Sequence, residues 1–242
     1  ELTAAYQAGM YSLEEIVLLT WEIGRLAAKL EGRMLHGFQT DDEIARLEVC
    51  LSSKNFLLGG KTHVTVSGSQ EEMLDFLGRH DQFTQMKPDH PWHHRDYREC
   101  AGDLASPPSG PARNASFVSG VSGQFESQLL ENHWRTWLAE PIDFLAAVES
   151  VQKDMGDQET EIIEIGFHPV LQQCFEGFDN HCYASSMYRG QDDIKWILNQ
   201  RRKLDQAPFI DRITEVIESF RPELDFDLEL AYQDFSSLGF VQ

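Results

Sequence analysis

The stretch "THVTVSGSQEEMLDFL", residues 62–77, decides how the chain is organised, because it joins a strand to a helix through a Ser-Gly turn. Its first half alternates β-branched residues with others, as strands do, and its second half is a capped amphipathic helix. Outward from it, the pattern predicts two strands and a helix before residue 62, and a final short strand at 82–87. This β-α-β-β-α-β order matches the split motif of ferredoxin-like folds, so residues 33–88 are predicted to form a small α+β subdomain.

The segment before this subdomain, residues 1–32, predicts helix. In "LEEIVLLTWEIGRLAAKL" (13–30) apolar residues recur at steps of three and four, which is the period of an amphipathic helix. Ser12 and Glu15 have the spacing of a capping box at its start. An earlier helical stretch stops at Gly9.

The segment after the subdomain, residues 89–203, predicts an α/β body. "TEIIEIGFHP" (160–169) has the near-continuous β-branched character of a buried parallel strand and ends in a glycine-containing turn. "VLQQCFEGF" (170–178) is the helix expected after it. In open α/β sheets binding sites lie beyond the carboxyl ends of the strands, where this sequence places His168.

Charge and composition exclude several classes of partner. The chain has 242 residues with 40 acids against 20 bases, a formal charge of −20, and no basic stripe that could bind a nucleic-acid backbone. The same balance disfavours an anionic membrane surface, and no apolar run reaches the length of a membrane span. The four cysteines have no zinc-ribbon or CxxC spacing, and the start has no signal-peptide pattern. These features favour a reduced, cytoplasmic protein.

The densest group of titratable side chains is "HPWHH", residues 90–94, with Asp89 and Asp96 on either side. Three interpretations are open: a metal site, acid–base chemistry, or histidines without a chemical role. A zinc site needs three or four ligands from separated elements, and the sequence has no second cluster, so no metal is predicted.

In their order along the chain, these segments resemble the acyltransferase domain of polyketide and fatty-acid synthases, the malonyl-CoA:acyl-carrier-protein transacylase family. The resemblance covers roughly residues 1–203, and "FVSGVSG", "ENHWRTWLAEPIDFLAAVESV" and "SSMYRGQDD" contribute to it. It implies an α/β fold, with an α/β-hydrolase-like body formed by residues 1–32 and 89–203. Residues 33–88 would be an inserted ferredoxin-like subdomain.

The resemblance also implies roles for the histidines. The family's general base is a histidine preceded three residues earlier by another, which matches His93 and His90. An imidazole suits this role because its pKa of about 6.5 lets it accept and return a proton near neutral pH. His94 stands where the family usually has serine, and His168 corresponds to loop residues near the family's site. His90, His94 and His168 are therefore candidate substrate-binding residues.

The sequence departs from the family pattern in two ways: the nucleophile is not among residues 1–242, and Ile23 replaces an arginine. Glu1 fits the closing glutamate of the family's Gly-His-Ser-x-Gly-Glu elbow, so the nucleophilic serine is expected just upstream of residue 1. Ile23 stands where members selective for malonyl or methylmalonyl groups carry an arginine that pairs with the substrate carboxylate. An apolar residue there implies a neutral acyl group, such as acetyl or a longer starter. The alternative is a one-turn misalignment in which Arg25 or Arg33 serves.

The last segment, residues 204–242, is similar to the start of a carrier protein. "FSSLGFVQ" (235–242) resembles the run-up to the motif that bears phosphopantetheine, with Ser237 as the candidate attachment site. An ordinary helix and linker is the alternative, because neither alignment of the motif matches throughout.

The resemblance as a whole implies an enzyme that moves an acyl group from acyl-CoA to the phosphopantetheine thiol of an acyl carrier protein through an acyl-serine. No permanently bound cofactor is expected, and a neighbouring ketosynthase domain is implied as a further partner. Two alternatives stay open: a catalytically inactive scaffold or docking module of a synthase, and an acyl-thioester hydrolase.

Overall fold

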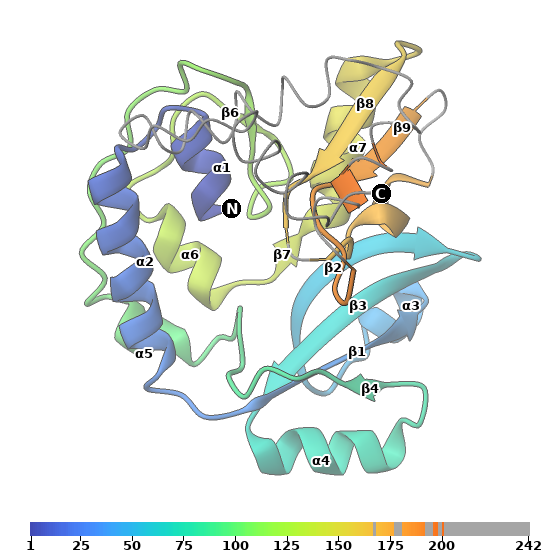
Figure 1. Cartoon of the computed structure of the whole chain (residues 1–242). Helices are drawn as coiled ribbons and strands as arrows, with labels where there is room; N and C mark the ends of the chain where they lie inside the picture. The colour runs from blue at the N-terminus through green and yellow to red at the C-terminus, as the bar shows by residue number, and fades with distance from the viewer. Residues whose placement is uncertain (167, 177–180, 192–195, 198–199, 201–242) are drawn as a thin grey trace, which may run out of the picture. The chain divides into compact units, whose positions relative to one another are not determined.

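The chain divides into two compact units (Figure 1). Unit 1 comprises Glu1–Gly156 and Gln173–Gly177, and unit 2 comprises Asp157–Gln172 and Phe178–Gln242. The computed structural model describes residues 1–166, 168–176, 181–191, 196–197 and 200. The carrier-like segment 204–242, with Ser237, lies outside the described residues, so its assignment stays a prediction.

Two helices open unit 1, α1 (Leu2–Gln7) and α2 (Leu13–Ala27). Gly9 between them has a φ of 78°, a left-handed conformation that glycine adopts without steric cost, and the predicted helix stop is confirmed. The predicted capping box also forms. Its serine, Ser12, accepts a hydrogen bond from the Glu15 amide at 3.2 Å, while the Glu15 carboxylate accepts one from the Ser12 amide at 2.8 Å.

The buried face of α2 belongs to an apolar cluster shared with α1, α5 (Tyr97–Ala101) and α6 (His133–Ala139). Trp134 of α6 is 1% exposed, and its indole N–H donates to the Tyr11 hydroxyl at 3.0 Å, so its one polar atom is satisfied inside the cluster. Other fully buried members are Ala5, Leu19, Leu26, Tyr97, Leu104 and Leu138. This cluster fixes the helices that carry the site described below.

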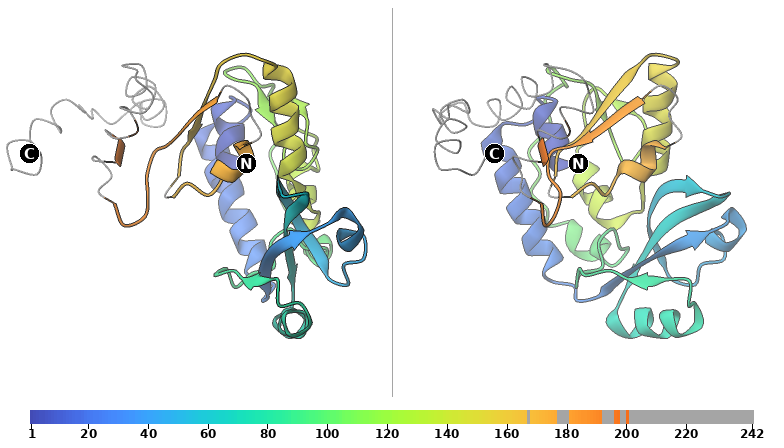
Figure 2. Two further views of the ribbon diagram at one scale, coloured as in Figure 1. Left: turned by 90° about the vertical axis from the view of Figure 1, so that its right-hand side faces the viewer. Right: turned by 45° about the vertical axis from the view of Figure 1, so that its right-hand side comes forward.

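Five strands of unit 1 form one sheet in the order β4-β1-β3-β2-β7 (Figures 1 and 2). They are β1 (Arg33–Gln39), β2 (Cys50–Leu58), β3 (Lys61–Gly68), β4 (Thr84–Gln85) and β7 (Ile142–Asp143). Neighbouring strands run antiparallel, except that β7 runs parallel to β2. The short helix α3 (Asp41–Ile44) follows β1, and α4 (Gln70–Arg79) follows β3. The elements from β1 to β4 therefore run β-α-β-β-α-β.

The α4 side of this sheet forms a second apolar cluster. Val64 and Val66 of β3 are both fully buried and pack with Leu35 of β1 against Met73 and Phe76 of α4. The alternation in "THVTV" places the valines on this face, while His63 and Thr65 lie on the opposite one. The quoted strand–turn–helix is thus held together by burial on one face of the sheet.

A two-residue turn, Gly59-Gly60, connects β2 to β3, with Leu58 paired to Lys61. The φ angles of the two glycines are 58° and 78°. Two positive φ values are what a type I′ hairpin turn requires, and glycine is the residue that meets this need most easily. The segment "FLLGGKT" therefore extends the hairpin and is not an irregular loop.

The remaining elements of unit 1 are a small two-stranded sheet and a helix. β5 (Phe117–Val118) pairs antiparallel with β6 (Phe125–Glu126), and α7 spans Phe144–Met155. The strand in "SFVSGVSG" is therefore only two residues long. Asp143 caps α7 by accepting a hydrogen bond from the Ala146 amide at 3.0 Å.

Unit 2 contains two parallel strands, β8 (Thr160–Glu164) and β9 (His181–Ser185). The parallel strand predicted within 160–169 is confirmed, but its predicted burial is wrong, because four of the five β8 residues are partly exposed. Among the described residues β8 pairs with β9 alone, so only one of its edges is covered. Within the described part of 170–178, a single 3₁₀ turn, Gln172–Phe175, forms where the α-helix was expected.

The sheet face opposite α4 carries a cluster around His63. The His63 ring stacks on Phe56 at 4.7 Å between centroids, its Nδ1 accepts from the Asn55 amide at 3.1 Å, and its Nε2 lies 3.1 Å from His36 Nδ1. With Nδ1 as an acceptor, Nε2 must carry the single proton and donate it to His36. Burial, followed by the neighbouring charge of His36, lowers the pKa of His63 to about 4.

We expect the stability of the protein to fall as the pH drops from about 6.5 toward 4, and His63 to account for part of the loss. The folded-state pKa of His63 is about 4 and the unfolded value about 6.5, so the unfolded chain binds more protons in this window. After allowance for the ring's partial exposure, the contribution is about 1–2 kcal/mol. Denaturant unfolding of the wild type and His63→Gln at pH 7 and pH 4.5 measures it.

The matched control for this measurement is Val64→Ala, a buried change on the same strand without a titratable group. It should lower the free energy of unfolding by a similar amount at both pH values. In His63→Gln, by contrast, the difference in stability between the two pH values should shrink. An unchanged difference in His63→Gln contradicts the assignment.

Candidate active site

The loop that carries "HPWHH" lies between β4 and α5 and is tied to the rest of unit 1 at three points. The Gly32 amide donates to the Asp89 carbonyl at 3.1 Å, and the buried Ser52 hydroxyl donates to the Trp92 carbonyl at 2.6 Å. His90 Nδ1 lies 3.1 Å from the Leu30 carbonyl and so donates to it. These bonds anchor the loop to β2 and to the segment that follows α2.

His93 has an unusual backbone on this loop. Its φ is 56°, and it is the one non-glycine residue with a positive φ among the described residues. Histidine tolerates this conformation better than most residues, but it still costs free energy, and such positions are concentrated at functional sites. Its ring stands edge-on to Trp137 with 4.7 Å between the centroids.

The hydrogen bond of the His93 ring defines which nitrogen is available for chemistry. His93 Nδ1 lies 2.6 Å from the Trp137 carbonyl oxygen, which can only accept, so Nδ1 carries the proton. In the neutral imidazole Nε2 is then the basic nitrogen with a free lone pair. A histidine held by a backbone carbonyl in this way is oriented to accept a proton at Nε2.

The electrostatic surroundings keep this ring neutral. Burial lowers the pKa of His93, and it is opposed first by the hydrogen bond to Trp137 and then by the Glu1 carboxylate. A lowered pKa means that the imidazole is unprotonated at neutral pH, which is the form that a general base needs. The arrangement can therefore take up a proton at Nε2 and release it again.

The Glu1 carboxylate lies at the start of α1 and is almost completely buried. Its Oε1 accepts hydrogen bonds from His133 Nε2 at 2.9 Å and from the Ser119 hydroxyl at 3.2 Å. The side chains of Glu1 and His133 are 9% and 7% exposed. Sequence reasoning missed His133, because its partner lies 132 residues away and no local pattern marks the pair.

The two other histidines of the loop have different surroundings. His90 is partly exposed, with the Asp89 carboxylate 3.5 Å from its Nε2. His94 is 3% exposed, and its Nδ1 accepts from the Asp96 amide at 3.2 Å. Its Nε2 is buried without a hydrogen bond to any described residue. Burial lowers the pKa of His94, against the opposing charges of Asp96 and Glu72.

Ile23 lies on the buried face of α2 and is 2% exposed. It belongs to the apolar cluster against which Trp92, the residue before His93, and Trp137, whose carbonyl binds His93, also pack. Arg25 is exposed and bonds to Glu22 at 2.6 Å on the outside of the same helix. The structure thus places an apolar side chain, and not Arg25, on the inner face at this turn.

His168 belongs to unit 2, whereas His90, His93 and His94 belong to unit 1, so a shared pocket stays a prediction. Within unit 2 its Nδ1 accepts from the Arg189 amide at 3.4 Å, and its ring stands edge-on to Tyr188. Tyr188 in turn contacts the Trp196 ring at a tilt of 39°, with 4.6 Å between the centroids.

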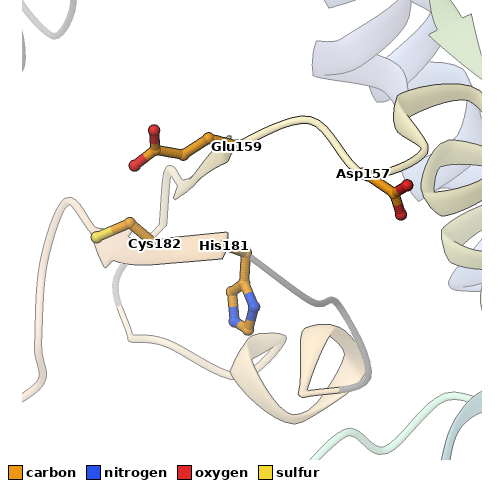
Figure 3. Close-up of a pocket in the computed structure, with 4 residues that line it drawn as sticks. All are labelled: Asp157, Glu159, His181 and Cys182. Carbon is orange, nitrogen blue, oxygen red and sulfur yellow. The ribbon is translucent and has the colours of Figure 1, made fainter.

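Unit 2 also contains an open pocket of about 310 Å³, lined by Asp157, Glu159, His181 and Cys182 (Figure 3). These residue types can ligate metals, but their side chains point in different directions and share no centre (Figure 3). Across the described ranges, no three His, Cys, Asp or Glu side chains are placed to hold a metal ion. No helix in that part of the chain combines the length and apolar character that a membrane crossing requires.

Comparisons by sequence lead to polyketide synthases. The chain is 26% identical over 226 residues to squalestatin hexaketide synthase from Phoma sp., covering 84% of this chain and 9% of that protein. It is 28% identical over 205 residues to the highly reducing polyketide synthase verA from Penicillium polonicum, covering 71% and 8%. The chain thus spans less than a tenth of the length of these relatives. No family model matches it.

Comparisons by structure lead to acyltransferases. The acyltransferase domain from module 8 of the salinomycin polyketide synthase matches with a TM-score of 0.71 at 17% identity, covering 84% of this chain and 51% of that one. FabD from Acinetobacter baumannii matches with a TM-score of 0.64 at 17% identity, covering 86% and 70%. A malonyl CoA-acyl carrier protein transacylase from Clostridium perfringens matches at 0.64 and 16%, covering 85% and 69%.

The fold is therefore of the acyltransferase class, with mixed α and β content. Within that class the chain resembles the acyltransferase domains of polyketide synthases and the malonyl-CoA:acyl-carrier-protein transacylases, and the resemblance predicted from the sequence is confirmed.

Proposed function

We propose that this chain is part of an acyltransferase domain of a polyketide-synthase-type enzyme. The domain would move an acyl group from coenzyme A to the phosphopantetheine thiol of an acyl carrier protein or carrier domain. The observation that carries this proposal is the His93 ring, whose Nδ1–H is bonded to the Trp137 carbonyl at 2.6 Å so that Nε2 can act as a base. The fold and the polyketide synthase relatives support the same reading.

The reaction would proceed in two halves through an acyl-serine. A serine upstream of Glu1 would attack the thioester carbonyl while its hydroxyl proton passes to His93 Nε2. As the carbon–sulfur bond breaks, that proton goes to the departing coenzyme A thiolate. In the second half His93 Nε2 takes the proton of the carrier thiol, the sulfur attacks the acyl-serine carbonyl, and the proton returns to the serine oxygen.

The acyl group would be uncharged, such as acetyl or a longer starter. Ile23, which the resemblance aligns with the family's carboxylate-binding arginine, is buried, and Arg25 is exposed and paired with Glu22. A carboxylate placed against Ile23 would lose its hydration without gaining a charged partner, which is unfavourable by several kcal/mol. An uncharged alkyl chain does not have this cost, because it loses no favourable hydration when it packs against Ile23.

The remaining predictions follow from the same proposal. Residues 33–88, which contain the β1–β4 elements, would be the family's inserted subdomain, and the neighbouring ketosynthase and the carrier would be partners in a cytoplasmic synthase. His90, His94 and His168 stay candidates for substrate contacts, and Ser237 a candidate phosphopantetheine site.

The test is the intact mass of the full-length protein after incubation with acetyl-, longer acyl- and malonyl-CoA, followed by transfer to a carrier protein. We expect a covalent acyl adduct from the neutral donors, and its passage to the carrier thiol. Rapid release of free acid without transfer would indicate a thioester hydrolase instead. No adduct and no turnover with any donor would contradict the proposal and favour a scaffold role.

A further inference from the structure

The start of α1 and the first turn of α6 are joined by a buried polar contact that the proposed mechanism does not yet use. Glu1 Oε1 and His133 Nε2 are 2.9 Å apart, and both side chains are more than nine-tenths buried. A buried carboxylate is stable only when donors satisfy it, and here His133 and Ser119 both donate to the same oxygen. The other oxygen, Oε2, faces the backbone at Gly120.

The same helix α6 also holds the candidate base. His133 and Trp137 lie four residues apart on α6, so they are on the same side of the helix, one turn from each other. His133 binds Glu1 and the Trp137 carbonyl binds His93 Nδ1. The two contacts together set the separation between the start of α1 and the His93 ring.

We propose that His133 is a positioning residue for acyl transfer: through its buried bond to Glu1 it fixes the Glu1 carboxylate and docks α6, which binds His93 through the Trp137 carbonyl, on the start of α1. This inference rests on the proposed function, because it assigns His133 a part in that reaction. His133 touches neither substrate nor the reacting atoms in it. It acts through Glu1 and through α6.

The Glu1 carboxylate has an electrostatic role in this arrangement. During each half-reaction His93 becomes an imidazolium, and a fixed negative charge nearby stabilises it. Among the described residues, the charged side chain that acts on His93 is the Glu1 carboxylate, which raises its pKa. Without His133 the carboxylate loses a hydrogen bond and is free to move away.

The test compares single-turnover acyl loading in the full-length wild type and three variants between pH 5 and pH 8. His133→Phe keeps an aromatic ring against Trp134 but removes the N–H, and should slow loading by about tenfold to a hundredfold. The pH midpoint of its acid limb should move to lower pH, because the effect of Glu1 on His93 is weakened. His133→Gln keeps an N–H donor and should restore most of the rate. Glu1→Gln should shift the midpoint in the same direction as His133→Phe.

A double variant separates this role from loss of folding, since breaking a buried pair is itself destabilising. Glu1→Gln combined with His133→Phe should be no slower than the worse single variant, because both changes remove one interaction. Thr136→Val is the control on α6, because among the described residues the Thr136 hydroxyl bonds only the carbonyl of Asn132, the N-cap of its own helix. It should leave rate and midpoint unchanged.

The outcomes distinguish the two levels of the proposal. Normal loading and an unmoved midpoint in His133→Phe, or a His133→Gln variant no faster than His133→Phe, overturn the positioning role and leave the acyltransferase proposal intact. A wild type that loads no acyl group overturns the proposed function, and the positioning role with it.

Discussion

Replacing His93 with glutamine is expected to slow acyl loading of the full-length protein by about 10²- to 10⁴-fold, the usual contribution of a general base. Glutamine keeps a similar volume and can still donate to the Trp137 carbonyl, but it has no basic nitrogen. The effect should lie in kcat, because His93 would act on the reacting proton rather than on substrate affinity. Rapid-quench measurement of the acyl adduct in single-turnover experiments gives the rate.

The matched control is His80→Gln at the C-cap of α4, where the histidine ring stacks on Phe76 at 4.2 Å, on the helix side of the five-stranded sheet. It removes a histidine of the same chemistry from the same unit and should load at the wild-type rate. If His93→Gln loads within about threefold of the wild type, a general base worth at least 10²-fold is absent, and another residue must activate the serine.

The parts of the fold that could be predicted are those that local sequence determines. Ser12 and Glu15 are three residues apart, so the whole capping box lies in one turn and its pattern is visible in the sequence. In "THVTV" the period of two places Val64 and Val66 on one face, which the second apolar cluster covers. A helix cap within one turn and a strand face with a period of two can therefore be predicted from a few neighbouring residues, without the rest of the chain.

Features that depend on the number of neighbouring strands were predicted less well. The β-branched run in 160–164 is typical of a strand buried between two others, yet among the described residues β8 pairs only with β9. The β-propensity of a residue indicates that it fits a strand, but it does not indicate how many neighbouring strands pair with that strand.

In the candidate site, too, local features could be predicted and long-range contacts could not. The cluster "HPWHH" was conspicuous by residue type, and the family resemblance selected His93 within it, but nothing in the sequence indicates the hydrogen-bond partner of His93. That partner is the backbone carbonyl of residue 137, 44 residues away, and every residue has a carbonyl. His133 escaped notice because its contact with Glu1 exists only once α1 and α6 are packed together. Long-range polar pairs carry no local signal, so only the folded chain reveals them.

Replacing Ile23 with arginine is expected to change which donor the enzyme accepts, by about 10- to 100-fold in the ratio of malonyl to acetyl loading. Ile23 is 2% exposed and packs in the cluster that Trp92 and Trp137 border, so the wild type should favour a neutral acyl group. An arginine there would supply a charge-assisted hydrogen bond to a carboxylate, worth about 1.5–3 kcal/mol. Competition between malonyl-CoA and acetyl-CoA, read as the mass of the adduct, measures the ratio.

Two further variants make this prediction decisive. Arg25→Ala should leave the ratio unchanged, because Arg25 is exposed and bonds to Glu22 outside the cluster. If the wild type instead prefers malonyl-CoA and Arg25→Ala abolishes that preference, Arg25, two residues after Ile23, binds the carboxylate and the neutral-acyl proposal fails. Ile23→Ala is needed because Ile23→Arg buries a guanidinium, which destabilises the fold when no carboxylate is bound. By emptying space in the same cluster without adding charge, it should favour longer neutral chains over acetyl and leave malonyl loading low.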